Sequence, residues 1–139
     1  MSFRGFLIIF LIFTSLSLWS QSSISLSELS KGKDRKYVLK QTNDLFSGIA
    51  FGKYENGQVG MQGKMTDGLF NGLWTWWYKD GSKKRETTYV SGVKEGYSYW
   101  WFKNGVKKSE IKYSHNKNIE QKRWDETGNL LPNPKMGRQ

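Results

Sequence analysis

The chain has 139 residues, enough for one domain, and carries 22 Lys and Arg against 12 Asp and Glu, for a net charge of +10. Aromatic residues make up 16%, with 15 Gly and only 2 Pro, a composition that favours a β-rich fold with many turns over a helical bundle. With no Cys and a single His, disulfide scaffolds, thiolate metal sites and Cys nucleophiles are excluded and little remains for triad chemistry. We therefore expect a protein that is not an enzyme, with no catalytic residue, cofactor or metal ion.

Residues 1–20 have the features of a secretory signal peptide. Arg4 supplies a positive start, residues 6–13 form an apolar run, and residues 14–20 are small and polar. The run is shorter than the roughly 20 apolar residues of a membrane span, although an uncleaved anchor is the alternative. The sequence thus predicts a periplasmic or secreted protein, cleaved after Ser20.

Two further segments flank the main domain. Residues 21–36 are rich in Ser and Lys and poor in apolar residues, so we expect a flexible or loosely docked leader. Residues 132–139 form a basic tail that we expect to fray. The folded domain is therefore predicted to span residues 37–131.

A 24-residue period organises this domain. Its copies cover residues 45–68, 69–92, 93–116 and, in part, 117–131. Each full copy contains an Asn-Gly or Asp-Gly pair, which favours a tight primed β-turn with positive φ angles. An aromatic run precedes each pair and a strand-like alternation follows it. The period predicts an all-β fold, a single-layer antiparallel meander of repeated β-hairpins in which neighbouring hairpins bury a shared core.

The pattern resembles the MORN repeat in its bacterial variant. The residues that carry the resemblance are Trp77-Tyr78-Lys79-Asp80-Gly81 and Trp101-Phe102-Lys103-Asn104-Gly105, followed by Tyr89 and Tyr113. Residues 45–48 (LFSG) are similar to the start of antitoxin-like MORN-variant proteins. The resemblance implies a hairpin-repeat fold and a binding role, either as the antitoxin of a toxin–antitoxin pair or as a membrane-linked scaffold like the eukaryotic MORN proteins.

Both faces of the predicted sheet carry aromatic side chains. They indicate either core packing or a partly exposed platform for a sugar ring, a peptide or the apolar face of a partner. The first copy has Gly52 where the later copies have Trp76 and Trp100, and this gap favours a local site. We expect four aromatic contact anchors: Trp76, Tyr78, Trp100 and Phe102.

Basic residues recur after the turns. Four of them complete the predicted binding surface: Lys83, Lys84, Lys107 and Lys108. The neighbours Lys84–Glu86 and Lys108–Glu110 also allow a solvated strand face in which opposite charges offset one another. Attraction to an anionic surface is a further interpretation, whereas predicted export argues against nucleic acid as the partner.

Three functional hypotheses follow. The first is an exported, non-enzymatic protein-interaction or scaffolding module with an unknown protein partner. The alternative is direct binding of an envelope glycan or an anionic membrane surface through the aromatic and Lys rows. The third is an antitoxin-like role beside a secreted toxin.

Overall fold

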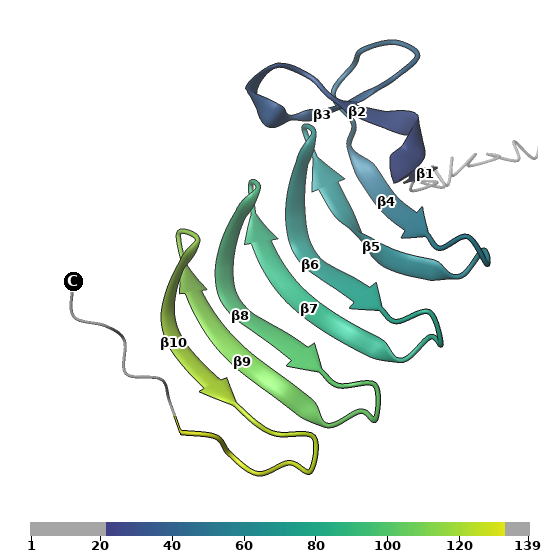
Figure 1. Ribbon diagram of the computed structural model, residues 1–139. Helices are drawn as coiled ribbons and strands as arrows, with labels where there is room; N and C mark the ends of the chain where they lie inside the picture. Colours follow the sequence, from purple (N-terminus) through teal and green to yellow (C-terminus); the bar gives the residue numbers. More distant parts are fainter. Residues whose placement is uncertain (1–21, 133–139) are drawn as a thin grey trace, which may run out of the picture.

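The computed structural model describes residues 22–132, which form one bent layer of β-strands (Figure 1). Eight strands make one sheet in the order β1-β4-β5-β6-β7-β8-β9-β10, and β2 and β3 form a separate ribbon. All neighbouring strands are antiparallel except β1, which is parallel to β4. The strands are β1 (Ser23–Ser25), β2 (Leu29–Lys31), β3 (Tyr37–Leu39), β4 (Gly48–Lys53), β5 (Val59–Thr66), β6 (Leu69–Trp77), β7 (Lys83–Val90), β8 (Val93–Trp101), β9 (Lys107–Ser114) and β10 (Lys117–Arg123), with single 3-10 turns η1 (Leu26–Glu28) and η2 (Lys33–Arg35).

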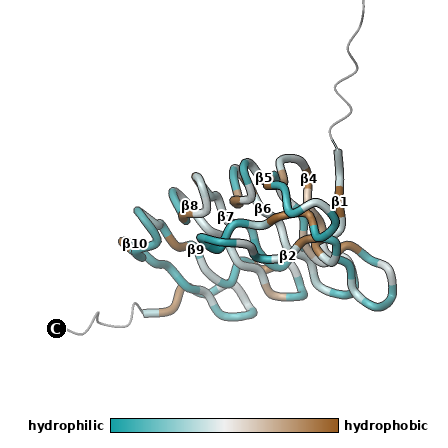
Figure 2. Tube along the Cα trace, turned by 90° about the horizontal axis from the view of Figure 1, so that it is seen from above, coloured by the Kyte–Doolittle hydropathy of each residue, from teal (hydrophilic) through white to brown (hydrophobic). Residues whose placement is uncertain are grey.

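The predicted all-β meander is confirmed. From β4 to β10, each strand pairs with the next along the chain, and Figure 2 shows them as a row of similarly bent arcs. The predicted signal peptide and most of the basic tail lie outside the described residues.

The pairs Asn56-Gly57, Asp80-Gly81 and Asn104-Gly105 form hairpin loops, but not the tight primed turns that we expected. In the first loop, Tyr54 N–H donates to the Gln58 carbonyl at 2.8 Å and Gly57 N–H donates to the Tyr54 carbonyl at 2.9 Å. Gly57 has a positive φ of 85°, whereas Asn56 does not. This is a type I turn followed by a left-handed Gly. Asn56 instead accepts the Gln58 N–H through Oδ1 at 3.2 Å, so its role is to cap the turn.

Tight primed turns occur at the opposite ends of the strands. Both central residues have positive φ in each of three two-residue turns: Asp67-Gly68, Ser91-Gly92 and His115-Asn116. Sequence reasoning missed all three turns: Ser-Gly and His-Asn are weaker turn signals than Asn-Gly, and Asp67-Gly68 has no Asp-Gly counterpart at this place in the other repeats.

These turns join the end of each repeat to its beginning. The second turn residue donates its N–H to a backbone carbonyl 22 positions earlier: Gly68 to Phe46 at 2.8 Å, Gly92 to Phe70 at 2.8 Å, and Asn116 to Lys94 at 3.1 Å. The first turn residue donates to a side chain 20 positions earlier: Asp67 to Ser47, Ser91 to Asn71, and His115 to Glu95. Ser47, Asn71 and Glu95 thus accept equivalent hydrogen bonds although they are different residue types. The 24-residue period is therefore kept in the hydrogen-bond pattern and not in the residue type.

Residues 22–36 are not the flexible leader that we expected. They contain β1, η1 and β2, and Leu29 is only 5% exposed, in one cluster with Met65 and Trp74. Leu26 packs beside Gly52, where an added Cβ would lie 3.5 Å from the Leu26 Cδ1 atom. The gap in the aromatic row is thus filled by the chain's own N-terminal segment and is not a separate site. Isolated leucines among serines gave too weak a hydrophobic signal to predict this packing.

Trp74 is the centre of the core. Its side chain is fully buried, its Nε1 donates to the Lys64 carbonyl at 2.9 Å, and Phe70 stacks on it with ring centroids 3.7 Å apart. The indole lies flat against Gly63 of the neighbouring strand, where any Cβ would overlap the ring. Gly63 therefore provides the space that Trp74 occupies.

We predict that Gly63→Ala destabilises the protein by about 1–3 kcal/mol, because the added methyl group forces the buried indole out of place. Chemical denaturation measures this change. Gly57→Asn is the matched control, since nothing lies within 4 Å of its Cβ position and Asn tolerates a positive φ. Equal losses in both variants would contradict this account of the core.

Candidate functional site

The strand register divides the side chains of the sheet between two faces. Directly paired residues share a face, and successive residues alternate. The Arg85 face contains the row Met61, Trp76, Arg85, Trp100, Ser109 and Arg123, each paired with the next. The Tyr99 face contains the parallel row Gln62, Thr75, Glu86, Tyr99, Glu110 and Lys122.

Arg85 lies between two indoles. Its guanidinium carbon is 3.4 Å from the ring centroid of Trp76 and 4.9 Å from that of Trp100. A desolvated cation stacked on Trp in this way gains on the order of 2 kcal/mol. Burial lowers the pKa of the guanidinium, which nevertheless stays charged at neutral pH.

The same row holds unsatisfied donors. Arg85 Nε, Trp100 Nε1 and Arg123 Nε are buried and have no hydrogen-bond partner among the described residues. An unpaired buried donor costs about 1–3 kcal/mol, so three in one row are not explained by stability alone. All three are donors, so a molecule that complements this row must supply acceptors.

The predicted basic doublets are divided between the two faces. A register shift beside Trp76 pairs Lys83 with Trp77 and leaves Lys84 as the extra residue of a β-bulge, 5.5 Å from the Tyr78 ring centroid. The same shift recurs one repeat later, where Lys108 lies 5.1 Å from the Phe102 ring centroid. The eight predicted binding residues therefore do not form one surface.

On the Tyr99 face, the charges offset one another. Lys83 pairs with Glu86 at 2.6 Å, Lys107 with Glu110 at 2.9 Å, and Lys122 with Glu120 at 3.5 Å. Glu86 and Glu110 thus pair with Lys83 and Lys107, and not with Lys84 and Lys108 as the sequence suggested.

The four predicted aromatic anchors are all partly buried. Trp76 packs against the core and on Arg85, which gives it a structural role. The hydroxyl of Tyr78 is engaged, since Oη donates to the Trp101 carbonyl at 2.8 Å, as Tyr54 donates to Trp77 at 2.7 Å. Phe102 occupies the same repeat position without a hydroxyl. Trp100 and Phe102 are therefore the two predicted anchors that contribute least to holding the fold together.

A hollow of about 420 Å³ lies beside Arg123 at the C-terminal end of the Arg85 face. Its lining includes Phe102, Lys108, Ser109, Trp124 and Leu131. Asp125 and Glu126 also border it. Hydrogen bonds from Thr127 and Asn129 lower the pKa of the Asp125 carboxyl to about 2, so this group is negatively charged at neutral pH. Sequence reasoning did not select Arg85 or Arg123 as a site residue. The signal that could have identified them is a basic residue that pairs across the strands with the row of Trp residues.

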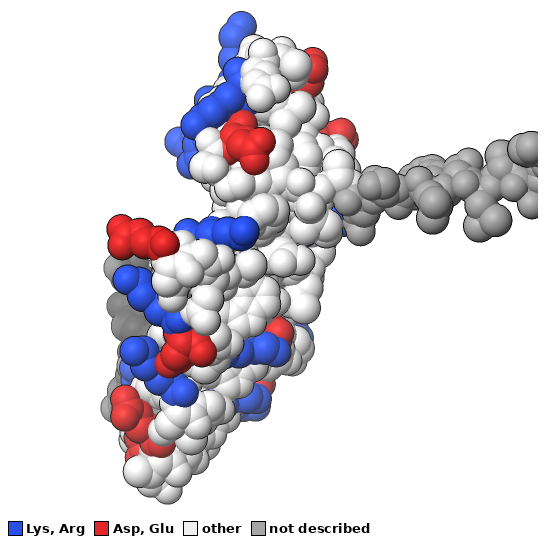
Figure 3. All heavy atoms as spheres, turned by 90° about the vertical axis from the view of Figure 1, so that its right-hand side faces the viewer, with Lys and Arg blue, Asp and Glu red and all other residues white. Residues whose placement is uncertain are grey.

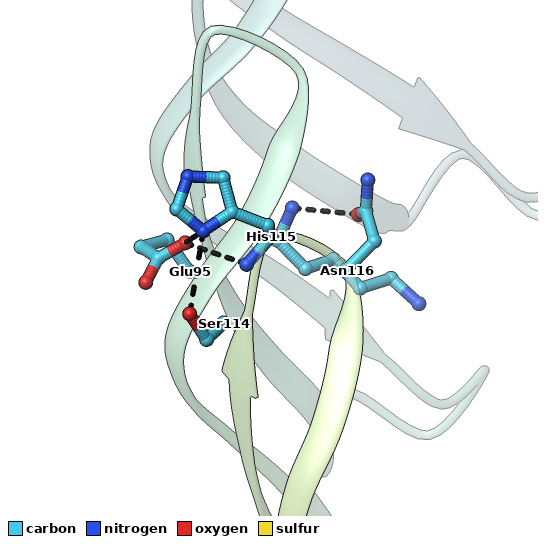
Figure 4. Close-up of polar contacts among 5 residues, drawn as sticks. Glu95, Ser114, His115 and Asn116 are labelled. Atoms are coloured by element: carbon cyan, nitrogen blue, oxygen red, sulfur yellow. Dashed lines mark hydrogen bonds and ion pairs between the residues drawn. The ribbon is translucent and has the colours of Figure 1, made fainter.

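His115 lies in an exposed turn (Figure 4). Its Nδ1 is 3.3 Å from Ser114 Oγ and 3.7 Å from Glu95 Oε2. A Ser-His-acid relay uses both ring nitrogens, whereas both contacts here fall on Nδ1. The Glu95–His115 arrangement therefore supports the turn and is not a catalytic triad.

Two other kinds of site were sought within residues 22–132. In this range, no group of three or more His, Asp or Glu side chains could hold a metal ion. The same residues contain no helix that is long and apolar enough to cross a membrane.

We predict that Tyr78→Phe destabilises the protein by about 1 kcal/mol, because it removes the hydrogen bond that joins two repeats. Thermal and chemical unfolding measure the change. Tyr97→Phe is the control, because the Tyr97 side chain contacts Tyr99 and Lys112 through its ring, which Phe retains. The prediction fails if the two variants unfold alike.

Comparison with known proteins agrees with this geometry. Residues 70–91 match the family model described as the MORN repeat variant, and this segment covers most of the β6–β7 hairpin. No curated protein and no solved structure matches the chain significantly. MORN repeats are modules that bind proteins or membrane lipids. The β6–β7 hairpin is therefore the part of the chain that is similar to the MORN repeat variant.

Proposed function

We propose that the protein is a non-enzymatic interaction module that binds a partner protein on the C-terminal half of its Arg85 face. The observation that carries the proposal is that the N-terminal segment covers only one half of this face. Ile24, Leu26 and Leu39 of the N-terminal segment pack against the core. Within residues 22–132 no second layer lies over β8 to β10 (Figure 1).

The uncovered part has the chemistry of a protein-binding surface. It presents partly buried Trp100 and Phe102, flanked by Lys108 and Arg123, next to the hollow. Aromatic residues and Arg are enriched in the energetically dominant centres of protein interfaces. A single sheet layer with apolar side chains on both faces gains stability when a partner covers one of them.

Direct binding of an anionic membrane or glycan has less support. On the side shown in Figure 3, basic and acidic side chains are interspersed along the stack and do not gather in a single-sign patch. Lys83 and Lys107 of the Tyr99 face are paired with Glu. Broad attraction to an anionic surface requires a large patch of one sign of charge.

Export and an antitoxin-like role stay predictions. If residues 1–20 are removed as predicted, the partner belongs to the cell envelope or the exterior. The purified protein would then begin at Gln21, which N-terminal sequencing detects. A toxin as the partner would make the role antitoxin-like.

The test is co-purification with the full chain carrying a C-terminal tag, expressed in its host and analysed by mass spectrometry. We expect one stoichiometric protein partner, retained by Tyr97→Ser and largely lost with Phe102→Ser, because these changes remove one aromatic ring from each face. Unfolding curves verify that both variants fold.

Retention of the protein on insoluble envelope material without a partner protein would contradict the proposal and favour surface binding. Loss of the partner with Tyr97→Ser alone would place the interface on the other face.

A further inference from the structure

The row Trp76–Arg85–Trp100–Ser109–Arg123 crosses strands β6 to β10 on the Arg85 face. The cations on or beside its uncovered part are Lys84, Arg85, Lys108 and Arg123. None of the four forms an ion pair with a carboxylate within residues 22–132. The charges of this face are therefore available, in contrast to those of the Tyr99 face.

The strand residues of this face in β7 to β10 include no Asp or Glu. Those of the Tyr99 face in the same strands include Glu86 and Glu110, each paired with Lys. Alternation along each strand thus places these carboxylates on the Tyr99 face. The strand residues of the Arg85 face keep positive charges without ion pairs beside aromatic rings, which suits a carboxylate-bearing partner. The only carboxylates that border its hollow within residues 22–132 are Asp125 and Glu126.

The Arg85 guanidinium is also pre-organised. The two indoles hold it in place, so binding a carboxylate costs less side-chain entropy than it does for a free surface Arg. A planar guanidinium pairs with a carboxylate through two parallel hydrogen bonds. Arg123 provides a second guanidinium at the hollow, on the other side of Trp100 and Ser109.

The spacing of the two guanidinium groups selects a partner geometry. Arg85 and Arg123 are on strands β7 and β10, three strand spacings apart, or about 14 Å. In an extended peptide, side chains at positions i and i+4 point to the same side and are about 13 Å apart. Two acidic residues at this spacing would face both arginines, with the intervening i+2 side chain over Trp100 and Ser109.

We propose that the partner docks through an extended acidic segment that crosses β7 to β10, with carboxylates four residues apart bound to Arg85 and Arg123. This inference rests on the proposed function and specifies the chemistry of the partner. The N-terminal segment leaves this stretch of the row uncovered, and the three unsatisfied donors lie along it.

The experiment uses the purified full-length protein and two labelled ten-residue peptides of Gly, Ser and Thr. One peptide carries two Glu at positions i and i+4, and the other carries them at i and i+1. Fluorescence anisotropy gives the dissociation constants. We expect the i, i+4 peptide to bind several-fold more tightly, although both have the same charge, because adjacent side chains point to opposite sides.

Arg85→Gln and Arg123→Gln should each weaken binding of the i, i+4 peptide about tenfold, as expected for the loss of one charged hydrogen-bonding group. Lys83→Gln removes one charge from the Tyr99 face and is the matched control, with an expected change of less than about threefold. Arg85→Lys keeps the charge and should not restore the affinity, because Lys lacks the planar, stacked fork. Unfolding curves establish that each variant is folded.

Equal weakening by Lys83→Gln would overturn the proposal, as would equal affinity for the two peptides. Binding to vesicles that contain an anionic phospholipid, but to neither peptide, would assign this face to a membrane surface instead. Undiminished co-purification of the partner protein with a folded Arg85→Gln variant would refute the acidic segment and leave the interaction module intact.

Discussion

Hydrogen bonds between residues 22 and 23 positions apart fix the register of this sheet. At one end of the strands, Tyr hydroxyls bind carbonyls of the next repeat. At the other end, the primed turn that closes each repeat binds a carbonyl at the start of that repeat. A slip of one residue would move every side chain to the opposite face. Because hydrogen bonds hold both ends of the strands, equivalent positions of successive repeats lie side by side. The rows of side chains on each face follow from this constraint.

Because the register is fixed, the same repeat position can hold different residue types in successive repeats. Where β5 places Gly63 against Trp74, the next repeat places Thr87 against Ser98, with a buried hydrogen bond of 2.7 Å. The core thus changes from a large aromatic residue under the N-terminal segment to small polar residues beyond it. The change coincides with the end of the cover, so the same sheet has a packed half and an open half.

Sequence periodicity predicted the strands and the face of the residues that keep a regular alternation, because alternation is a local pattern. It did not predict where Leu26 and Leu29 pack, since two leucines in a polar segment have no period of their own. The Asn-Gly pairs predicted hairpins, but the loop type depends on strand twist and on the bulges beside Trp76 and Trp100. Those bulges also separate Lys83 from Lys84, which two adjacent lysines in a sequence cannot reveal. The Arg85 stack depends on register across three strands and was therefore missed.

The central claim is that binding uses the Arg85 face. The most direct measurement is the proton–nitrogen NMR spectrum of the labelled protein during titration with the i, i+4 acidic peptide. The account predicts that the indole N–H signal of Trp100 and the Nε–H signals of Arg85 and Arg123 shift together, while the Trp101 indole signal on the Tyr99 face stays unchanged. Shifts confined to Trp77 and Trp101, with Trp100 unaffected, would contradict it.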